Sequence, residues 1–190
     1  MYDTKIAAKL LAQLNGFLGR ISPHFRKPVA RFIGDMMYGI MAEKDVKLSS
    51  IVRALKEGIT PKKVEDRLSR MLSSKGVEDT IRHVKQSYRL EDIRLFKYGK
   101  LKAMAAVVLA TVYFSMVWIG NSEKHAVIAR SIARMSFRIH GVPDFHFYSI
   151  ADGASEILKG HGGRWRGFDQ SEAERKREAS LFEFFGLNTG

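Results

Sequence analysis

The chain contains no cysteine among its 190 residues, which excludes disulfides, cysteine-based metal sites and thiol nucleophiles. It has four prolines, and no segment shows the strict apolar–polar alternation of a β-strand. Acidic residues are few beside basic ones: 20 Asp and Glu against 32 Lys and Arg give a formal net charge of +12. The composition therefore favours a mainly α protein that binds a polyanion, with nucleic acid as the first candidate and an anionic membrane surface as the second.

The N-terminal stretch lacks the unbroken apolar core of a secretory signal, because Lys9, Gln13 and Asn15 interrupt it. We therefore expect a cytoplasmic protein, and the absence of cysteine is compatible with that compartment. A long uncharged run, AMAAVVLATVYFSMVWI, covers residues 103–119 and has lysines on both sides. Its length lies at the lower limit for a membrane span, whereas its Ala, Ser and Thr content favours a helix buried on all sides in protein. Both interpretations stay open.

Apolar residues recur at helical spacing in two N-terminal segments, 6–18 and 29–40. This spacing predicts two amphipathic helices. The Met and Phe side chains of the second segment are expected in the core, because flexible Met and large Phe side chains fill apolar interiors.

The next two segments predict a pair of short helices. An apolar stripe covers 48–55, and Gly58 behind it suits the left-handed turn that ends a helix. Thr60 is a good N-cap, Pro61 suits the first helical position, and a second stripe covers 64–72. Helix, glycine turn, helix is the pattern of a helix-turn-helix, and a plain αα-hairpin with a solvated charged face has the same spacing.

In a helix-turn-helix, the N-terminal part of the second helix faces base edges while basic side chains along it touch phosphates. The predicted DNA-binding residues therefore lie off the apolar stripe of the second helix and at its N-cap. They are Thr60, Lys62, Lys63, Arg67 and Arg70.

A second candidate site lies in VEDTIRHVKQ, residues 77–86. Glu78, Arg82 and Lys85 are spaced i, i+4 and i+7, so on a helix they share one face and can point together at a phosphate and its metal ion. An ordinary solvated helix face stabilised by i,i+4 pairs fits the same spacing.

VEDTIRHVKQ resembles the segment that carries the catalytic Glu of the DDE transposases of bacterial insertion sequences. Further blocks resemble the same family in the same order: 32–55 (FIGDMMYGIMAEKDVKLSSIVRAL) before it, and 88–95 (YRLEDIRL) and 141–158 (GVPDFHFYSIADGASEIL) after it. The resemblance implies an RNase H-like core in which two Asp and one Glu hold two Mg²⁺ ions.

The resemblance implies roles for three residues. Glu78 matches the family's Glu and metal ligand, Lys85 its basic partner seven positions on, and Arg82 the intervening arginine. The two Asp partners are missing, because Asp35 and Asp66 lie in or beside predicted helices rather than at strand ends. One carboxylate cannot hold two metal ions, so we expect neither strand cleavage nor a bound cofactor.

The chain therefore resembles the two ends of a transposase joined without most of the catalytic core. We expect a helix-turn-helix-like DNA-binding region at 1–74, a helical remnant of the catalytic domain at 75–160 and a flexible charged tail at 161–190. The expected function is that of a truncated transposase that binds double-stranded DNA, such as terminal repeats. A second copy or a full-length transposase is a further expected partner. The alternative is a small basic membrane-associated helical protein, which the apolar run at 103–119 favours.

Overall fold

The computed structural model describes residues 2–73, 98–120, 125–140, 146–161 and 165–173. These residues form helices and no strand, which confirms the predicted mainly α fold. The elements are α1 Tyr2–Ile21, the 3₁₀ turn η1 Ser22–His24, α2 Lys27–Glu43, α3 Leu48–Leu55, α4 Pro61–Leu72, α6 Tyr98–Tyr113, the π-helical η2 Phe114–Gly120, α7 Ala126–His140 and α8 His146–Gly160.

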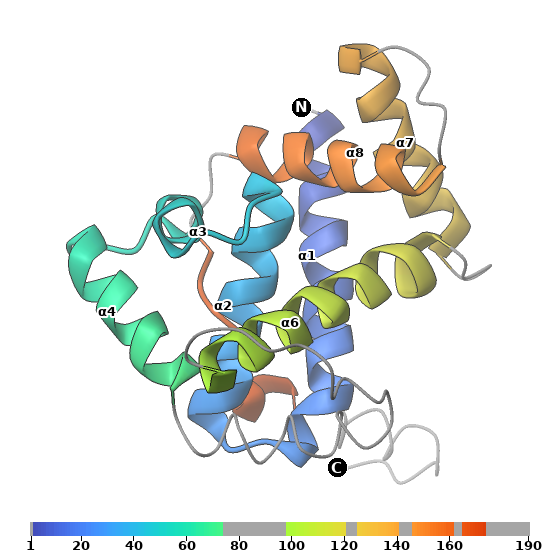
Figure 1. Ribbon diagram of the computed structural model, residues 1–190. Helices are drawn as coiled ribbons and strands as arrows, with labels where there is room; N and C mark the ends of the chain where they lie inside the picture. The colour runs from blue at the N-terminus through green and yellow to red at the C-terminus, as the bar shows by residue number, and fades with distance from the viewer. Residues whose placement is uncertain (1, 74–97, 121–124, 141–145, 162–164, 174–190) are drawn as a thin grey trace, which may run out of the picture.

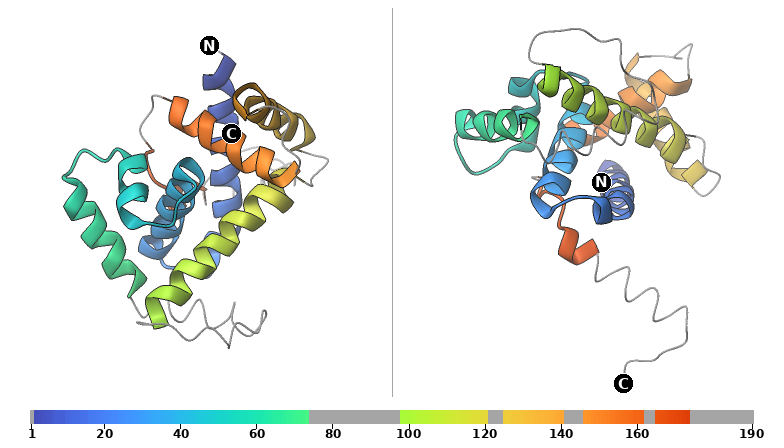
Figure 2. Two further views of the ribbon diagram at one scale, coloured as in Figure 1. Left: turned by 45° about the horizontal axis from the view of Figure 1, so that its top comes forward. Right: turned by 60° about the horizontal axis from the view of Figure 1, so that its bottom comes forward.

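Two helices, α1 and α2, run through the middle of the molecule (Figure 1). α8 crosses one end of both, α6 crosses α2, and α7 packs against α8. α3 and α4 stand at the opposite edge, where α3 lies against α2 and α4 is outermost (Figure 2). The predicted helix pair is therefore presented at the side of the molecule on a helical scaffold.

One hydrophobic core joins helices from both halves of the chain. Met36 and Met37 of α2 are fully buried, as the Met content predicts, and so are Leu14 of α1 and Ile132 of α7. Full burial of a large apolar side chain stabilises the fold by about 1.5–3 kcal/mol. In the described part of the chain, the regions predicted at 1–74 and 75–160 thus share a core rather than forming separate ones.

Close packing between α7 and α8 depends on Gly153. A Cβ atom built on Gly153 would overlap the main-chain carbonyl oxygen of Ile132 on α7. Glycine allows the two helix backbones to approach, because it has no side chain to hold them apart. On the other side of α8, the hydroxyl of Ser155 donates a hydrogen bond of 2.6 Å to the carbonyl of Ala42, which fastens α8 to the end of α2.

The long apolar run is buried on one face only, not on all sides. Ala103 and Phe114 are fully buried against the core, whereas Leu109, Val112 and Tyr113 are 45%, 41% and 49% exposed. Residues Gly99–Gly120 are long and apolar enough to cross a membrane, with a mean hydropathy of 1.9, and 28% of the apolar window is buried. The difference from the expectation arises because uniform hydropathy does not reveal how many neighbours pack around a helix.

The prediction of a flexible tail at 161–190 is wrong for residues 165–173, which pack against the helices. Trp165 and Phe168 are 6% and 5% exposed, and the Trp165 ring stacks on Tyr38 at a centroid distance of 4.8 Å. Two aromatic side chains bury enough apolar surface to fix a short segment that has no regular apolar spacing. Residues 174–190 lie outside the described part of the chain.

Candidate nucleic-acid interface

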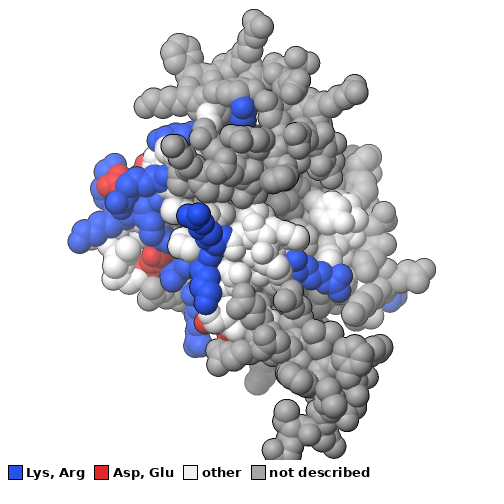
Figure 3. Space-filling model, turned by 90° about the horizontal axis from the view of Figure 1, so that it is seen from below, with Lys and Arg blue, Asp and Glu red and all other residues white. Residues whose placement is uncertain are grey.

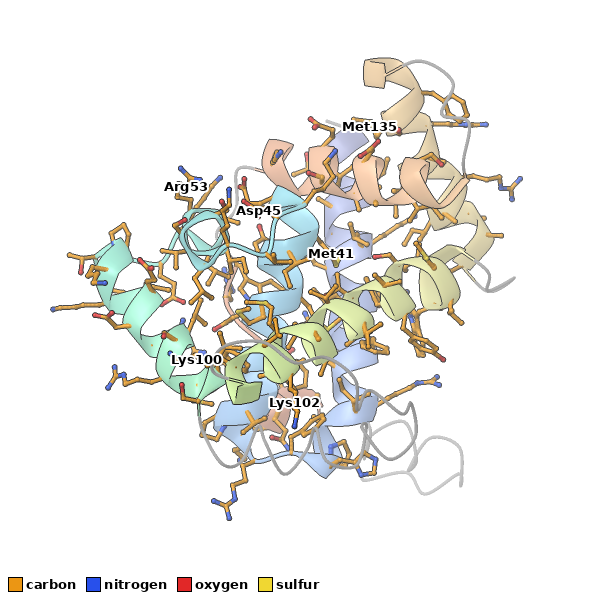
Figure 4. All side chains as sticks on the ribbon, viewed as in Figure 1. Met41, Asp45, Arg53, Lys100, Lys102 and Met135 are labelled. Atoms are coloured by element: carbon orange, nitrogen blue, oxygen red, sulfur yellow. The ribbon has the colours of Figure 1, made fainter. Side chains whose placement is uncertain are left out.

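The first helix of the pair, α3, is held at its start by Asp45. One carboxylate oxygen of Asp45 accepts the Lys47 N–H at 3.1 Å and the other accepts the Ser50 hydroxyl at 2.8 Å. These two hydrogen bonds, the one from Lys47 first, hold the pKa of Asp45 below its usual range. Ser50 also accepts a 3.2 Å bond from Arg53, which lies beside Asp45 in Figure 4.

The turn between α3 and α4 differs from the prediction in one residue. Lys56, not Gly58, takes the left-handed conformation that ends α3, with φ 48° and ψ 40°. The prediction from glycine's permissive backbone was wrong because a non-glycine residue can occupy this region at a modest energetic cost. Thr60 and Pro61 occupy the predicted N-cap and first helical positions, but the Thr60 side chain makes no capping hydrogen bond.

The apolar faces of the pair meet as predicted. Ile51 and Leu55 of α3 and Val64 and Leu68 of α4 are each at most 1% exposed. They join the core beside α2, and α2, α3 and α4 all contact one another. α4 is therefore fixed along one face, and its opposite face is left for other contacts.

The predicted DNA-binding residues at the start of α4 lie on that opposite face. Thr60, Lys62 and Lys63 are exposed, and so is Arg70 in the last turn. Lys62 forms an i,i+4 ion pair with Asp66 at 3.3 Å. Such an exposed pair contributes about 0.3–0.5 kcal/mol, so it is readily exchanged for a phosphate contact.

Arg67, the fifth predicted DNA-binding residue, points to the protein interior instead. Its Nη1 atom donates to Asp35 Oδ2 at 3.0 Å, and its Nη2 atom donates to a carboxylate oxygen of Glu57. The guanidinium thus bridges α2 and the turn before α4. Arg67 fixes the position of α4, and its donors are not directed at solvent as the prediction required.

Asp35 is the centre of this arrangement. It is 1% exposed, and its second oxygen accepts the Trp165 Nε1–H at 2.9 Å. Burial raises the pKa of Asp35, while the Trp165 hydrogen bond and the positive charge of Arg67 act in the opposite direction. Three segments distant in sequence, around 35, 67 and 165, therefore converge on one carboxylate.

Sequence reasoning missed the roles of Asp35 and Trp165. One signal was present: Asp35 interrupts an apolar helix face between Ile33 and Met36, and an acidic group buried there needs a partner. No spacing rule identifies Arg67 or Trp165 as that partner, because they lie 32 and 130 residues away.

The surface near α4 is predominantly basic. Residues 47–73 carry seven Lys and Arg against three Asp and Glu. Seen from below, Lys and Arg side chains gather on the side of the molecule where α4 lies, and Asp and Glu are fewer among them (Figure 3). Of the three acidic residues, Glu57 and Asp66 are paired with Arg67 and Lys62.

The second candidate site, Glu78 with Arg82 and Lys85, lies outside the described residues. Within the described ranges, no group of three His, Asp or Glu side chains is placed to hold a metal ion. The chain matches no family model, no curated protein and no solved structure.

Proposed function

We propose that the α3–α4 pair binds duplex DNA, and that the chain is a truncated transposase that retains DNA binding without strand cleavage. The observation that carries this proposal is the placement of α4: one face is packed on α2 and α3, and the opposite face presents Thr60, Lys62, Lys63 and Arg70. A basic helix held in this way matches the second helix of a helix-turn-helix.

Dimensions support a major-groove contact by α4. An α-helix with its side chains is about 10–12 Å wide, and the major groove of B-DNA is about 12 Å wide. In this arrangement Thr60 and Lys63, at the N-terminal end of α4, approach base edges. Lys62 and Arg70 approach the phosphates on either side, where the high positive charge of the chain also attracts the duplex from a distance.

We infer that the partner DNA is the terminal repeat of an insertion sequence, in the cytoplasm. Without cleavage, the chain would compete at these ends with a full-length transposase, or pair with it or with a second copy. Cleavage by two metal ions requires a set of carboxylates of which the sequence offers Glu78 alone, so no bound Mg²⁺ is needed for this function.

Neutralising Lys62 and Lys63 tests this function. The Lys62→Gln/Lys63→Gln variant should weaken binding to duplex DNA, and the slope of log affinity against log salt should become shallower by about 1, for the lost phosphate contact of Lys62. Fluorescence anisotropy of a labelled terminal-repeat duplex, titrated at several salt concentrations, measures both quantities.

The matched control is Lys5→Gln/Lys9→Gln, which removes two exposed lysines from the other end of the molecule. Its slope should stay within about 0.5 of the parent value, because those lysines are remote from α4. Equal slopes for both double variants would assign the binding to overall charge rather than to α4.

A second candidate function, membrane association, is favoured by the exposed apolar face of α6 and η2. Leu109, Val112, Tyr113 and Val117 lie at helical spacing on this face, each more than 40% exposed. If the chain associates with membranes, it should stay in the pellet after carbonate extraction, because apolar burial in lipid resists high pH. Recovery of the whole protein in the supernatant as a monodisperse species would exclude it.

A further inference from the structure

Three separate stretches of the chain are basic and contain no acidic residue. They are 26–34 at the start of α2, 67–73 at the end of α4, and 98–120 in α6 and η2. Together they carry seven Lys and Arg. In the sequence, segments that contain acidic residues lie between these three stretches. Whether the stretches form one basic surface therefore depends on the fold.

The fold brings the basic ends of these stretches to one side of the molecule. α6 contacts both α2 and α4. In Figure 1, α2 runs upward and α4 runs obliquely downward, so the start of α2 and the end of α4 both lie at the lower side of the molecule. Lys100 and Lys102 lie at this lower end of α6 (Figure 4). We define the α2–α6 basic end as Arg26, Lys27, Arg31, Lys100 and Lys102.

Lys100 connects this surface to the DNA-binding helix. Its Nζ atom donates to the Ser69 hydroxyl of α4 at 2.9 Å, next to Arg70 in the sequence. An ammonium group has three donors, and within the described ranges Ser69 takes one of them, which leaves two for an acceptor on a ligand. Ser69 lies six residues after Lys63 on α4, which at about 1.5 Å per residue is roughly 10 Å along the helix axis. Lys100, bonded to Ser69, is therefore within reach of the same stretch of duplex backbone as Lys63.

Lys27 and Lys100 of the basic end donate to hydroxyl groups rather than to carboxylates. Lys27 donates to the hydroxyl of Ser171, a neutral acceptor, at 2.9 Å. Arg26, Lys27 and Lys100 form no ion pair with any Asp or Glu of the described residues. Arg31 lies near Asp35, whose carboxylate is already bonded to Arg67 and Trp165.

We propose that the α2–α6 basic end is a second contact surface for the phosphate backbone of the same DNA duplex that α4 reads. This inference rests on the proposed DNA-binding function and extends its footprint past the C-terminal end of α4. The surface contributes phosphate contacts and no base contacts, so it strengthens binding to all duplex sequences alike.

The test removes three charges from this surface in the full-length chain. Arg26→Gln/Lys27→Gln/Lys100→Gln should make the salt slope of duplex binding shallower by about 3 and weaken binding to specific and unrelated duplexes by the same factor. The charge-conserving variant Arg26→Lys/Lys27→Arg/Lys100→Arg should bind like the parent. The control Lys5→Gln/Lys9→Gln/Arg130→Gln removes the same charge from exposed positions on α1 and α7.

Each variant should keep the circular-dichroism spectrum of the folded parent at the temperature of the binding assay. A lower melting temperature is expected for the basic-end variant, because it loses the hydrogen bonds of Lys27 and Lys100 to Ser171 and Ser69. If the parent binds duplex DNA and the Lys62→Gln/Lys63→Gln variant loses slope while the basic-end variant does not, the second surface is overturned and α4 binding stands. If the parent does not bind duplex DNA, both proposals fail. Loss of binding to vesicles of phosphatidylserine with an unchanged duplex slope would assign the surface to lipid and also overturn the inference.

Discussion

Replacing Arg67 with alanine is expected to lower the free energy of unfolding by about 2–3 kcal/mol. The substitution leaves Asp35, 1% exposed, as a buried carboxylate without its cationic partner, and removes the bond to Glu57. The Arg67 side chain is itself 31% exposed, so the loss should stay below the about 3–5 kcal/mol seen for fully buried pairs. Urea unfolding followed by circular dichroism measures it.

Arg70→Ala is the matched control, because Arg70 lies one turn further along α4 with no acidic partner among the described residues, and it should change stability by less than about 0.5 kcal/mol. A double-mutant cycle with Asp35→Ala should give a coupling energy of about 1–3 kcal/mol. Additive effects of the two substitutions would show that the Asp35–Arg67 contact does not fix α4.

The loss caused by Arg67→Ala should grow as the pH rises. Burial raises the pKa of Asp35 above its unfolded value, so the folded protein holds this proton more tightly and the group's contribution to stability falls as pH rises through both pKa values. Arg67 opposes this rise in the pKa of Asp35, so without Arg67 the free energy of unfolding should decrease more steeply as the pH rises. Near pH about 3, where the carboxyl is neutral in both states, the two proteins should differ least. A pH-independent difference would mean that Arg67 acts through packing alone.

Gly153→Ala is the second substitution with a large expected effect, a loss of about 3 kcal/mol in the free energy of unfolding. The added methyl group would overlap the carbonyl oxygen of Ile132, a main-chain atom that cannot move without shifting α7. This cost outweighs the gain of about 1 kcal/mol that alanine brings to a helix interior. Urea unfolding of the variant and the parent gives the comparison.

Gly16→Ala provides the control for helix propensity. Apart from its chain neighbours and the adjoining backbone of α1, no atom lies within 4 Å of a Cβ at Gly16, so this variant should be more stable by up to about 1 kcal/mol. If Gly153→Ala were as stable as the parent, α7 and α8 would have to separate without cost, contrary to their contact in the structure.

The helix pair itself was predictable because its signals are local. Apolar spacing predicted both faces, and Thr60 and Pro61 predicted where α4 begins. The end of α3 was not predictable in the same way. Glycine adopts the left-handed conformation most easily, which favoured Gly58, but Lys56 is the residue that adopts it and ends α3. Of the five predicted DNA-binding residues, four lie exposed, and Arg67 is held by carboxylates.

The amino-acid sequence by itself determined the mainly α class, the positions of the amphipathic helices and the excess of positive charge. These properties follow from residue spacing within one or two helical turns and from composition, so they need no knowledge of the fold. The tertiary structure decided which charged side chains pair with one another inside the protein and which lie exposed at its surface. Asp35 meets Arg67 and Trp165 across 32 and 130 residues, and the basic ends of α2, α4 and α6 meet on one side. Such contacts depend on how helices pack, which the periodicity of a single helix does not encode.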